Sequence, residues 1–160
     1  MLVIRKAQPR DVPDILQLVR ELAEYEREPQ AVVATEANLL ADGFGPEPRY
    51  QCLMADWDGS TAGFALYFHT YSTWVGRWGL FLEDLFVRPQ HRGRGIGKAL
   101  LVELARIAVQ KGCGRMNWHV LHWNEPAIRF YQKLGAKELR EWNIMRLDGE
   151  ALLKLGGGHG

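Results

Sequence analysis

The stretch that decides the fold is Leu80-Phe81-Leu82-Glu83-Asp84-Leu85-Phe86-Val87, followed closely by Arg92-Gly93-Arg94-Gly95-Ile96-Gly97-Lys98. The first segment is an apolar run typical of a strand, and an amphipathic helical pattern follows the second. The predicted order is therefore strand, glycine-rich basic loop and helix N-terminus. Glycines let the backbone approach a ligand closely, and the first amides of a helix attract phosphate. With two arginines and a lysine beside those amides, the segment predicts a cradle for a diphosphate.

The spacing of the glycines excludes two common nucleotide-binding loops. A nucleotide-triphosphate loop needs Gly-Lys followed by Ser or Thr, whereas Lys98 is followed by Ala99. A dinucleotide-binding loop needs G-x-G-x-x-G, and the glycines here alternate with other residues instead. What remains is the pattern R-x-x-G-x-G, formed by Arg92, Gly95 and Gly97. A flexible solvated loop is the alternative structural interpretation.

Two acids interrupt the apolar strand, which we expect over 78–87. Its odd and even positions are both apolar, as in a central strand that is buried on both faces. Glu83 and Asp84 are then expected to point to opposite faces. Because a buried carboxylate is costly unless it is paired or meets water, these acids need an explanation. One hypothesis is a structural salt bridge with one of the arginines, and the other is an active-site carboxylate.

The length and composition of the chain fit an ordinary globular protein. Its 160 residues are 47% hydrophobic and 24% charged, with a net charge of +1, which does not indicate a nucleic-acid surface. No apolar stretch reaches the roughly 18 residues of a membrane span, and the N-terminus is charged too early for a signal peptide. The two cysteines, Cys52 and Cys113, predict buried thiols in a cytoplasmic protein. We expect one domain over 1–155 and a flexible tail over 156–160.

Hydrophobic periodicity and turn residues predict alternating strands and helices. Strands are expected at 2–6, 50–56, 62–69, 78–87 and 115–121, with a last hairpin over about 136–147. Helices are expected from a cap at Asp11 to Tyr25, from a cap at Thr35 to Leu40, over 95–111 and over 125–134. A loop is expected over 42–48 and a hairpin turn at Asp58-Gly59. Helices between strands imply a mixed, largely covered sheet of the α/β class.

A second pattern lies downstream, Asn124-Glu125-Pro126-Ala127-Ile128-Arg129-Phe130-Tyr131-Gln132-Lys133-Leu134-Gly135-Ala136. Asn124 fits a helix cap, with Pro126 in the first turn, so its presence has a structural explanation. Phe130 and Tyr131 fit ordinary core positions. A tyrosine hydroxyl can also give a proton, which leaves a chemical role for Tyr131 open.

These two patterns together resemble the signatures of the GCN5-related N-acetyltransferase (GNAT) superfamily. Further segments resemble its diamine acetyltransferase family, which includes the spermidine/spermine and thialysine N-acetyltransferases. These segments are Glu21-Leu22-Ala23-Glu24-Tyr25-Glu26, Asp42-Gly43-Phe44-Gly45, Gly63-Phe64-Ala65-Leu66-Tyr67, Thr70-Tyr71-Ser72-Thr73-Trp74-Val75-Gly76-Arg77, Leu82-Glu83-Asp84 and Trp123-Asn124-Glu125-Pro126. The similarity runs over nearly the whole chain. It implies the GNAT fold, with a mixed, mostly antiparallel central sheet and helices on both faces.

The resemblance implies transfer of an acetyl group from acetyl-CoA to a primary amine by direct attack. An alkylamine has a pKa near ~10, so it must lose a proton before it attacks the thioester. Glu83 matches the family's base, which acts through ordered water, and Tyr131 matches the donor that protonates the departing thiolate. The oxyanion would meet a backbone amide near Leu85.

The resemblance also implies two sets of binding residues. The positions for acetyl-CoA are Leu85, Phe86, Val87, Arg92, Gly93, Arg94, Gly95, Ile96, Gly97, Lys98, Asn124 and Ala127. The positions for the amine are Tyr25, Glu26, Trp74, Asp84, Asn117, Trp118 and His119. Without the resemblance, Glu26 fits a solvated helix face. No metal is expected, because no carboxylate completes a known metal spacing with His119 and His122.

One departure from the family narrows the acceptor. Ser72 stands where polyamine-acetylating members carry an acidic residue. The lost negative charge favours a smaller amine with its own carboxylate, such as thialysine or a lysine-like amino acid. A polyamine acceptor, a protein lysine and a non-catalytic coenzyme A sensor remain open, although the presence of both Glu83 and Tyr131 argues against the sensor. The resemblance further implies a homodimer, with no nucleic-acid or membrane partner.

Overall fold

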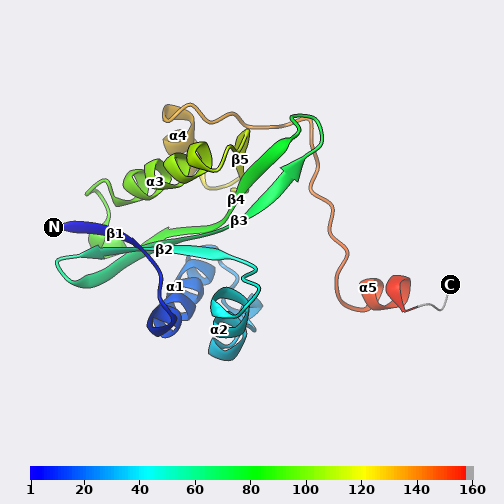
Figure 1. Cartoon of the computed structure of the whole chain (residues 1–160), viewed down its shortest axis with the longest axis horizontal. Coiled ribbons are helices and arrows are strands. Elements are labelled where there is room, and N and C mark those ends of the chain that lie inside the picture. The colour runs from blue at the N-terminus through cyan, green and yellow to red at the C-terminus, as the bar shows by residue number, and fades with distance from the viewer. Residues whose placement is uncertain (158–160) are drawn as a thin grey trace. The chain divides into compact units, whose positions relative to one another are not determined.

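The structure is a computed structural model that describes residues 1–157, and these gather into two compact units. The first unit covers Met1–Leu121 and contains a five-stranded sheet and three α-helices. The second unit begins at His122 and contains two α-helices among its described residues. Figure 1 shows the elements along the chain.

The sheet of the first unit has the strand order β1-β2-β3-β4-β5 (Figure 1). Its strands are β1 (Leu2–Lys6), β2 (Gln51–Trp57), β3 (Ser60–Ser72), β4 (Arg77–Val87) and β5 (Arg115–Trp118). Neighbours from β1 to β4 run antiparallel, whereas β4 and β5 run parallel. Asp58 and Gly59 both have positive φ and make the predicted tight turn between β2 and β3. The mixed, mostly antiparallel sheet is thus confirmed.

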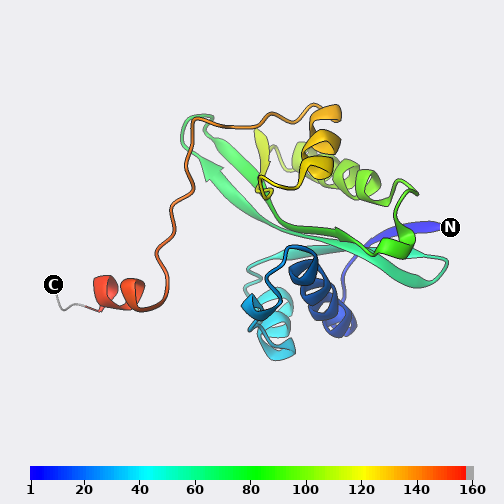
Figure 2. The same ribbon diagram turned by 180° about the vertical axis from the view of Figure 1, so that it is seen from behind.

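Helices cover both faces of this sheet (Figures 1 and 2). On one face lie α1 (Val12–Tyr25) and α2 (Glu36–Phe44), and on the other lies α3 (Ile96–Gln110). The α1 face holds a buried cluster of Ile15, Leu18, Cys52, Met54, Phe64, Leu66 and Phe86. Short 3-10 turns at Pro9–Asp11, Pro29–Ala31 and Pro89–His91 connect these elements. A sheet with two covered faces explains the nearly continuous apolar run of β4.

Several predicted boundaries need correction in the first unit. Thr35 does cap α2, through a capping box with Asn38, but the helix continues to Phe44 through residues predicted as loop. The edge-to-face contact of Phe44 with Tyr50 packs this added turn against the chain entering β2. Asp11 occupies the predicted N-cap position of α1, but its side chain makes no hydrogen bond to the helix, because its carboxylate accepts from Arg5 and from the amide of Gln8. Strand β5 ends at residue 118, three residues before the predicted end.

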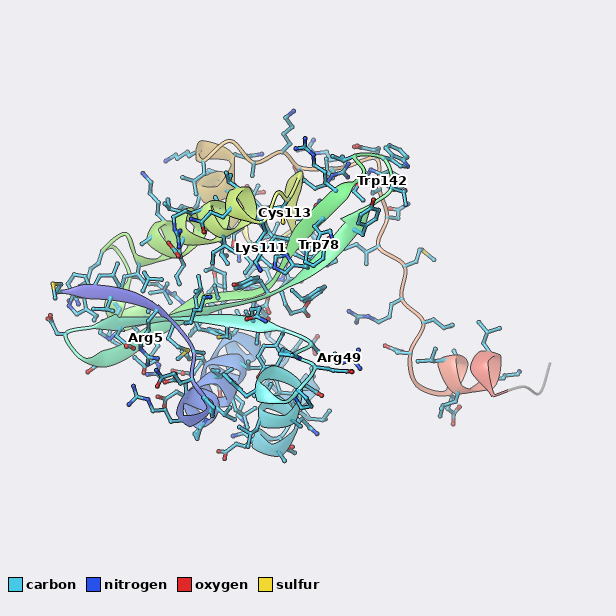
Figure 3. The ribbon with its side chains drawn as sticks, viewed as in Figure 1. Arg5, Arg49, Trp78, Lys111, Cys113 and Trp142 are labelled. Atoms are coloured by element: carbon cyan, nitrogen blue, oxygen red, sulfur yellow. The ribbon has the colours of Figure 1, made fainter. Side chains whose placement is uncertain are left out.

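The two cysteines are free thiols in different surroundings. Cys52 is buried, and burial raises the pKa of its thiol. Cys113 is partly exposed, so the prediction of burial is wrong for it. Its Sγ lies 3.8 Å from Nδ1 of His69. The His69 ring lies 5.4 Å from that of Trp78, which is labelled with Cys113 in Figure 3.

The second unit contains α4 (Glu125–Lys133) and α5 (Gly149–Gly156). The hairpin predicted over about 136–147 is wrong, because the structure assigns no strand to residues 134–148. An isolated two-stranded hairpin is only marginally stable in water without a further strand or helix to cover it. Helix α5 was not predicted, and it takes up residue 156, the first of the predicted tail. Residues 158–160 of that tail lie outside the described residues. No helix within residues 1–157 is long and apolar enough to cross a membrane.

Candidate active site

A β-bulge in β4 decides the direction of its two acids. Leu66 of β3 pairs with Asp84, but the next residue, Tyr67, pairs with Leu82. Glu83 is therefore an extra residue on β4 that has no partner of its own in the ladder. Such an extra residue restarts the alternation of side chains along the strand.

The bulge brings both acids to the α1 face of the sheet. Asp84 lies opposite Leu66, whose side chain belongs to the buried cluster on that face. Glu83 comes two residues after Phe81, which stacks on Phe68 at 5.2 Å, and Phe68 shares the face of Leu66 by alternation. The prediction that Glu83 and Asp84 point to opposite faces is therefore wrong. It assumed an unbroken period of two, which the bulge interrupts.

The surroundings of the two neighbouring acids differ sharply. Glu83 is exposed, whereas burial raises the pKa of Asp84 to about 7, with further contributions from the negative charges of Glu83 and Glu26. Burial also raises the pKa of Glu26, which caps the C-terminal end of α1. The charges of Glu26 and Glu83 thus both act on Asp84. Such a cluster attracts a cation and can accept a proton near neutral pH.

Beyond the bulge, one edge of β4 is open. The parallel ladder with β5 joins Gly79–Leu82 to Arg115–Trp118 and stops there. Residues 83–87 of β4 therefore pair only with β3 among the described strands. Backbone amides and carbonyls on that open edge can bond to an extended ligand, as a further strand would. Leu85, Phe86 and Val87, all predicted to bind acetyl-CoA, lie on this segment.

The glycine loop that follows β4 ends at the first turn of α3, where backbone amides are free. Gly93 and Gly95 have φ of 79° and 76°, and Gly95 is the N-cap of α3 in the left-handed conformation. The first hydrogen bond of the helix runs from the amide of Ala99 to the carbonyl of Gly95. The amides of residues 96–98 precede it, so they have no helical acceptor and favour a negatively charged group.

The side chain of Arg92 turns back from this loop toward α1. Its Nε donates to the carbonyl of Val87 at 2.9 Å. The guanidinium carbon lies 5.2 Å from the ring centre of Tyr25 and 5.5 Å from that of Phe86. Arg92 thereby connects the loop with the end of α1 that carries the predicted amine-binding residues.

The end of β5 adds polar groups beside the bulge. Asn117 and Trp118 pair with Phe81 and Leu82, the last residues of β4 that β5 reaches. The ring of His119 makes an edge-to-face contact with Phe81, at 5.1 Å between ring centres. Three predicted amine-binding residues therefore lie alongside the part of β4 that enters the bulge.

The sequence of this chain matches the model of a known protein family. The model of the acetyltransferase (GNAT) family matches residues 13–136, which spans most of the chain. The chain belongs to the GNAT acetyltransferase family. It is therefore an enzyme of the N-acetyltransferase class.

Relatives of this GNAT acetyltransferase carry more specific names. The thialysine N-epsilon-acetyltransferase of Bos taurus is 42% identical, with 97% of each chain covered. The spermidine/spermine N(1)-acetyltransferase-like protein 1 of Homo sapiens is 38% identical over 95% of this chain and 23% of the human protein. Among solved structures, an integron cassette protein from V. cholerae superposes with a TM-score of 0.81 at 29% identity, covering 96% of each chain. The GNAT fold and the likeness to diamine acetyltransferases are thereby confirmed.

In this GNAT acetyltransferase, Trp74 lies apart from the three carboxyl groups. It is 82% exposed in the turn that joins β3 to β4. Ser72 ends β3 opposite Arg77, and its hydroxyl accepts from the amide of Val75 at 3.2 Å. Glu83 follows Arg77 by six strand positions, a separation of roughly 20 Å. Within one chain, the structure therefore does not bring Trp74 or Ser72 to the acids.

Three predicted site residues of the GNAT acetyltransferase belong to the second unit. Asn124 occupies the N-cap position of α4, and Ala127 and Tyr131 lie on that helix. The ring of Tyr131 lies 5.5 Å from the ring of Phe130. Their roles toward the residues of the first unit remain predictions.

One ion pair between the end of β4 and α1 was not predicted from the sequence. Arg88 directly follows β4 and contacts Glu21 of α1, with Nη2 3.0 Å from Oε2. It also donates to the carbonyl of Thr61 at 2.9 Å. These residues are 67 and 27 positions apart in the chain, so no local pattern could have indicated the pair. Within residues 1–157, no group of three His, Cys, Asp or Glu side chains is placed to hold a metal ion.

Proposed function

We propose that this enzyme transfers acetyl from acetyl-CoA to the side-chain amine of a small cationic amino acid, such as thialysine or lysine. The observation that carries the proposal is the group of three carboxyl groups, Glu26, Glu83 and Asp84, on the α1 face of the sheet. Negative charge binds and orients an ammonium group. The 42% identity to a thialysine acetyltransferase over nearly the whole chain supports the same acceptor class.

Acetyl-CoA fits the segment that runs from the open edge of β4 to α3. The backbone of Leu85, Phe86 and Val87 would bond the extended pantetheine arm, since β5 no longer occupies that edge. The amides of residues 92–98, together with the side chains of Arg94 and Lys98, would hold the pyrophosphate. By the family resemblance, Asn124 and Ala127 would complete the site from α4.

The proposed chemistry is direct attack of the amine on the thioester. The amine first loses a proton, through ordered water, to Glu83, which is exposed and therefore open to that water. The amine nitrogen then forms a bond to the carbonyl carbon and releases its second proton to water, and the bond from that carbon to sulfur breaks. An amide near Leu85 would stabilise the oxyanion between these events.

Tyr131 is the proposed donor of the proton that the departing coenzyme A thiolate takes up. Its hydroxyl is the only part of the side chain that can perform this step. The variant Tyr131→Phe removes that hydroxyl alone and keeps the ring contact with Phe130. Unchanged turnover in this variant would overturn the role.

Ser72 supports an amino-acid acceptor over a polyamine. It lacks the negative charge that polyamine-acetylating relatives carry at this position, so a long polycation would lose one ionic contact. Ser72 lies roughly 20 Å from Glu83 in the same chain, so its effect would reach only an elongated acceptor or the site of another copy.

The test is the release of coenzyme A from acetyl-CoA in the presence of thialysine, lysine, ornithine, putrescine, spermidine, spermine and a lysine-containing peptide. We expect the highest kcat/KM among the amino acids. A polyamine as the best acceptor would keep the enzyme class and overturn the argument from Ser72. A peptide as the best acceptor would indicate a protein acetyltransferase. Bound acetyl-CoA without turnover on any amine would favour a coenzyme A sensor.

The assembly of the enzyme is part of the proposal. The family model crosses both units, so we propose that residues 1–155 act as one N-acetyltransferase domain. We further propose a homodimer, supported by the strongly exposed apolar residues of the second unit. The free cysteines are consistent with a cytoplasmic enzyme.

A further inference from the structure

Two arginines join the stem of the glycine loop to one stripe of α1. Arg88 and Arg92 flank the 3-10 turn Pro89–His91, which leads from β4 into the loop. Arg88 pairs with Glu21, and the guanidinium of Arg92 lies over the ring of Tyr25. Glu21 and Tyr25 are four residues apart, so they are neighbours on one face of the helix. The loop stem is therefore attached to the last turns of α1 at two successive points.

Of these two contacts, the one made by Arg92 lies next to the residues that are proposed to bind the acceptor amine. Its guanidinium lies between the rings of Tyr25 and Phe86, and its Nε is occupied by the carbonyl of Val87. Glu26, the next residue after Tyr25, ends α1 and contributes to the raised pKa of Asp84. A shift of the last turn of α1 would consequently move a carboxyl group that the proposed acceptor needs.

We propose that the side chain of Arg92 is a positioning residue for the acceptor site rather than a ligand of the coenzyme A pyrophosphate. It holds Tyr25 and Glu26 in place relative to β4 by stacking on Tyr25 and Phe86. The backbone of the loop keeps its role toward the diphosphate. The role toward the acceptor rests on the proposed function, whereas the attachment of the loop to α1 rests on the contacts alone.

The test compares two arginines of the same loop that carry the same charge. Arg94 lies over the ring of Trp57 in β2, at 4.7 Å, rather than over a ring of α1, so Arg94→Ala is a matched control. We expect Arg92→Ala to raise the KM of the amine about threefold to thirtyfold, the range of a lost cation–π contact. The Kd of coenzyme A, measured by calorimetry, should change less than about threefold. For Arg94→Ala we expect weaker coenzyme A binding and an unchanged amine KM.

Two further variants separate geometry from charge. Arg92→Lys keeps the positive charge but loses the planar group that spans two rings, so its amine KM should rise as in Arg92→Ala. Tyr25→Leu removes one ring, and the double variant Tyr25→Leu with Arg92→Ala should raise the amine KM by less than the product of the single effects. Tyr25→Phe keeps the ring and should keep the full effect of Arg92→Ala.

The proposal has a readout that needs no turnover. In free protein, Arg92→Ala should speed hydrogen exchange at the amides of residues 21–28, whereas Arg94→Ala should not. Weaker coenzyme A binding in Arg92→Ala that Arg92→Lys restores, with an unchanged amine KM and unchanged exchange, would overturn the proposal. If no amine is acetylated by the unaltered enzyme, the proposed function fails, but the exchange experiment still decides whether Arg92 holds α1.

Discussion

At the scale of single residues, two adjacent acids occupy one face of the sheet and differ in their exposure. Glu83 is open to water, whereas Asp84 is partly buried opposite Leu66, where the charges of Glu26 and Glu83 act on it. A proton acceptor must reach water, and a group that binds an ammonium ion gains from enclosure. The two positions therefore fit different tasks, base and amine ligand.

The role of Glu83 predicts a pH-dependent loss of activity. Glu83→Gln should lower kcat/KM about a hundredfold at pH 7, the usual contribution of a general base. The loss should shrink as pH rises toward about 10, because the free amine then deprotonates without help. The measurement is the pH profile of kcat/KM, with Glu24→Gln, an exposed acid two residues before Glu26, as the control. An equal loss at every pH would exclude Glu83 as the base.

The enclosure of Asp84 predicts a pH-dependent change in stability. Its pKa is about 7 when folded and about 3.9 when unfolded, so the folded state holds a proton more tightly. Ionising Asp84 thus costs stability progressively as pH rises through this interval, and the full cost remains above pH 7. Asp84→Asn should raise Tm by about 5 °C at pH 8 and change it little at pH 4.

Thermal unfolding of the ligand-free protein at both pH values checks this expectation. Asp42→Asn removes an exposed acid from α2 and serves as the control, with the same change in Tm at both pH values. An equal gain in Tm at pH 4 and pH 8 for Asp84→Asn would contradict the account of its enclosure.

At the scale of elements, α3 begins and ends at glycines with positive φ. Gly95 at its start has φ of 76° and Gly112 after its end has φ of 74°, and a side chain at either position would meet open space. The backbone strain of an L-residue is therefore the same at both ends. Only the start of the helix presents free amides to a phosphate.

The two glycines therefore allow matched substitutions, which should have similar effects on stability but different effects on coenzyme A binding. Gly95→Ala and Gly112→Ala should each lower the free energy of unfolding by about 1 to 2 kcal/mol. Coenzyme A affinity should fall about tenfold for Gly95→Ala and stay unchanged for Gly112→Ala. Denaturant unfolding and calorimetry measure the two quantities. Equal affinities in the two variants would show that the loop conformation does not hold the diphosphate.

At the scale of the whole molecule, the second unit exposes many apolar side chains. Those at least 47% exposed between residues 139 and 155 are Leu139, Trp142, Ile144, Met145, Leu147, Leu152, Leu153 and Leu155. So many exposed apolar side chains in one stretch of chain are typical of a segment that takes part in an interface. It supports the proposed homodimer through this part of the chain.

The dimer predicts a sedimentation result. The enzyme should sediment at twice the mass of one chain, and the double variant Trp142→Ser with Ile144→Ser should sediment as a monomer. Val33→Ser changes an apolar residue that is 85% exposed in the first unit and should leave the dimer intact. A monomer at all concentrations of the unaltered protein would overturn the proposed assembly.

Local patterns predicted most of the first unit. The apolar run of β4, the cap at Thr35 and the turn at Asp58-Gly59 each depend on neighbours a few residues away, and each is confirmed. The hairpin predicted over about 136–147 is absent from residues 134–148, because two strands alone need a further element to cover them. The first residues of the loop predicted over 42–48 belong to α2 instead, because the last turn of that helix packs on Tyr50.

The sequence by itself determined the family, the glycine loop before α3 and the identity of the acids, because these are matters of residue type and short spacing. Only the tertiary structure decided where those acids point. The bulge at Glu83 arises from the register between β3 and β4, and the contacts of Arg88 and Arg92 with α1 join residues 67 positions apart. The bulge and these long-range contacts depend on how whole elements pack against one another, so neighbouring residues in the sequence do not indicate them.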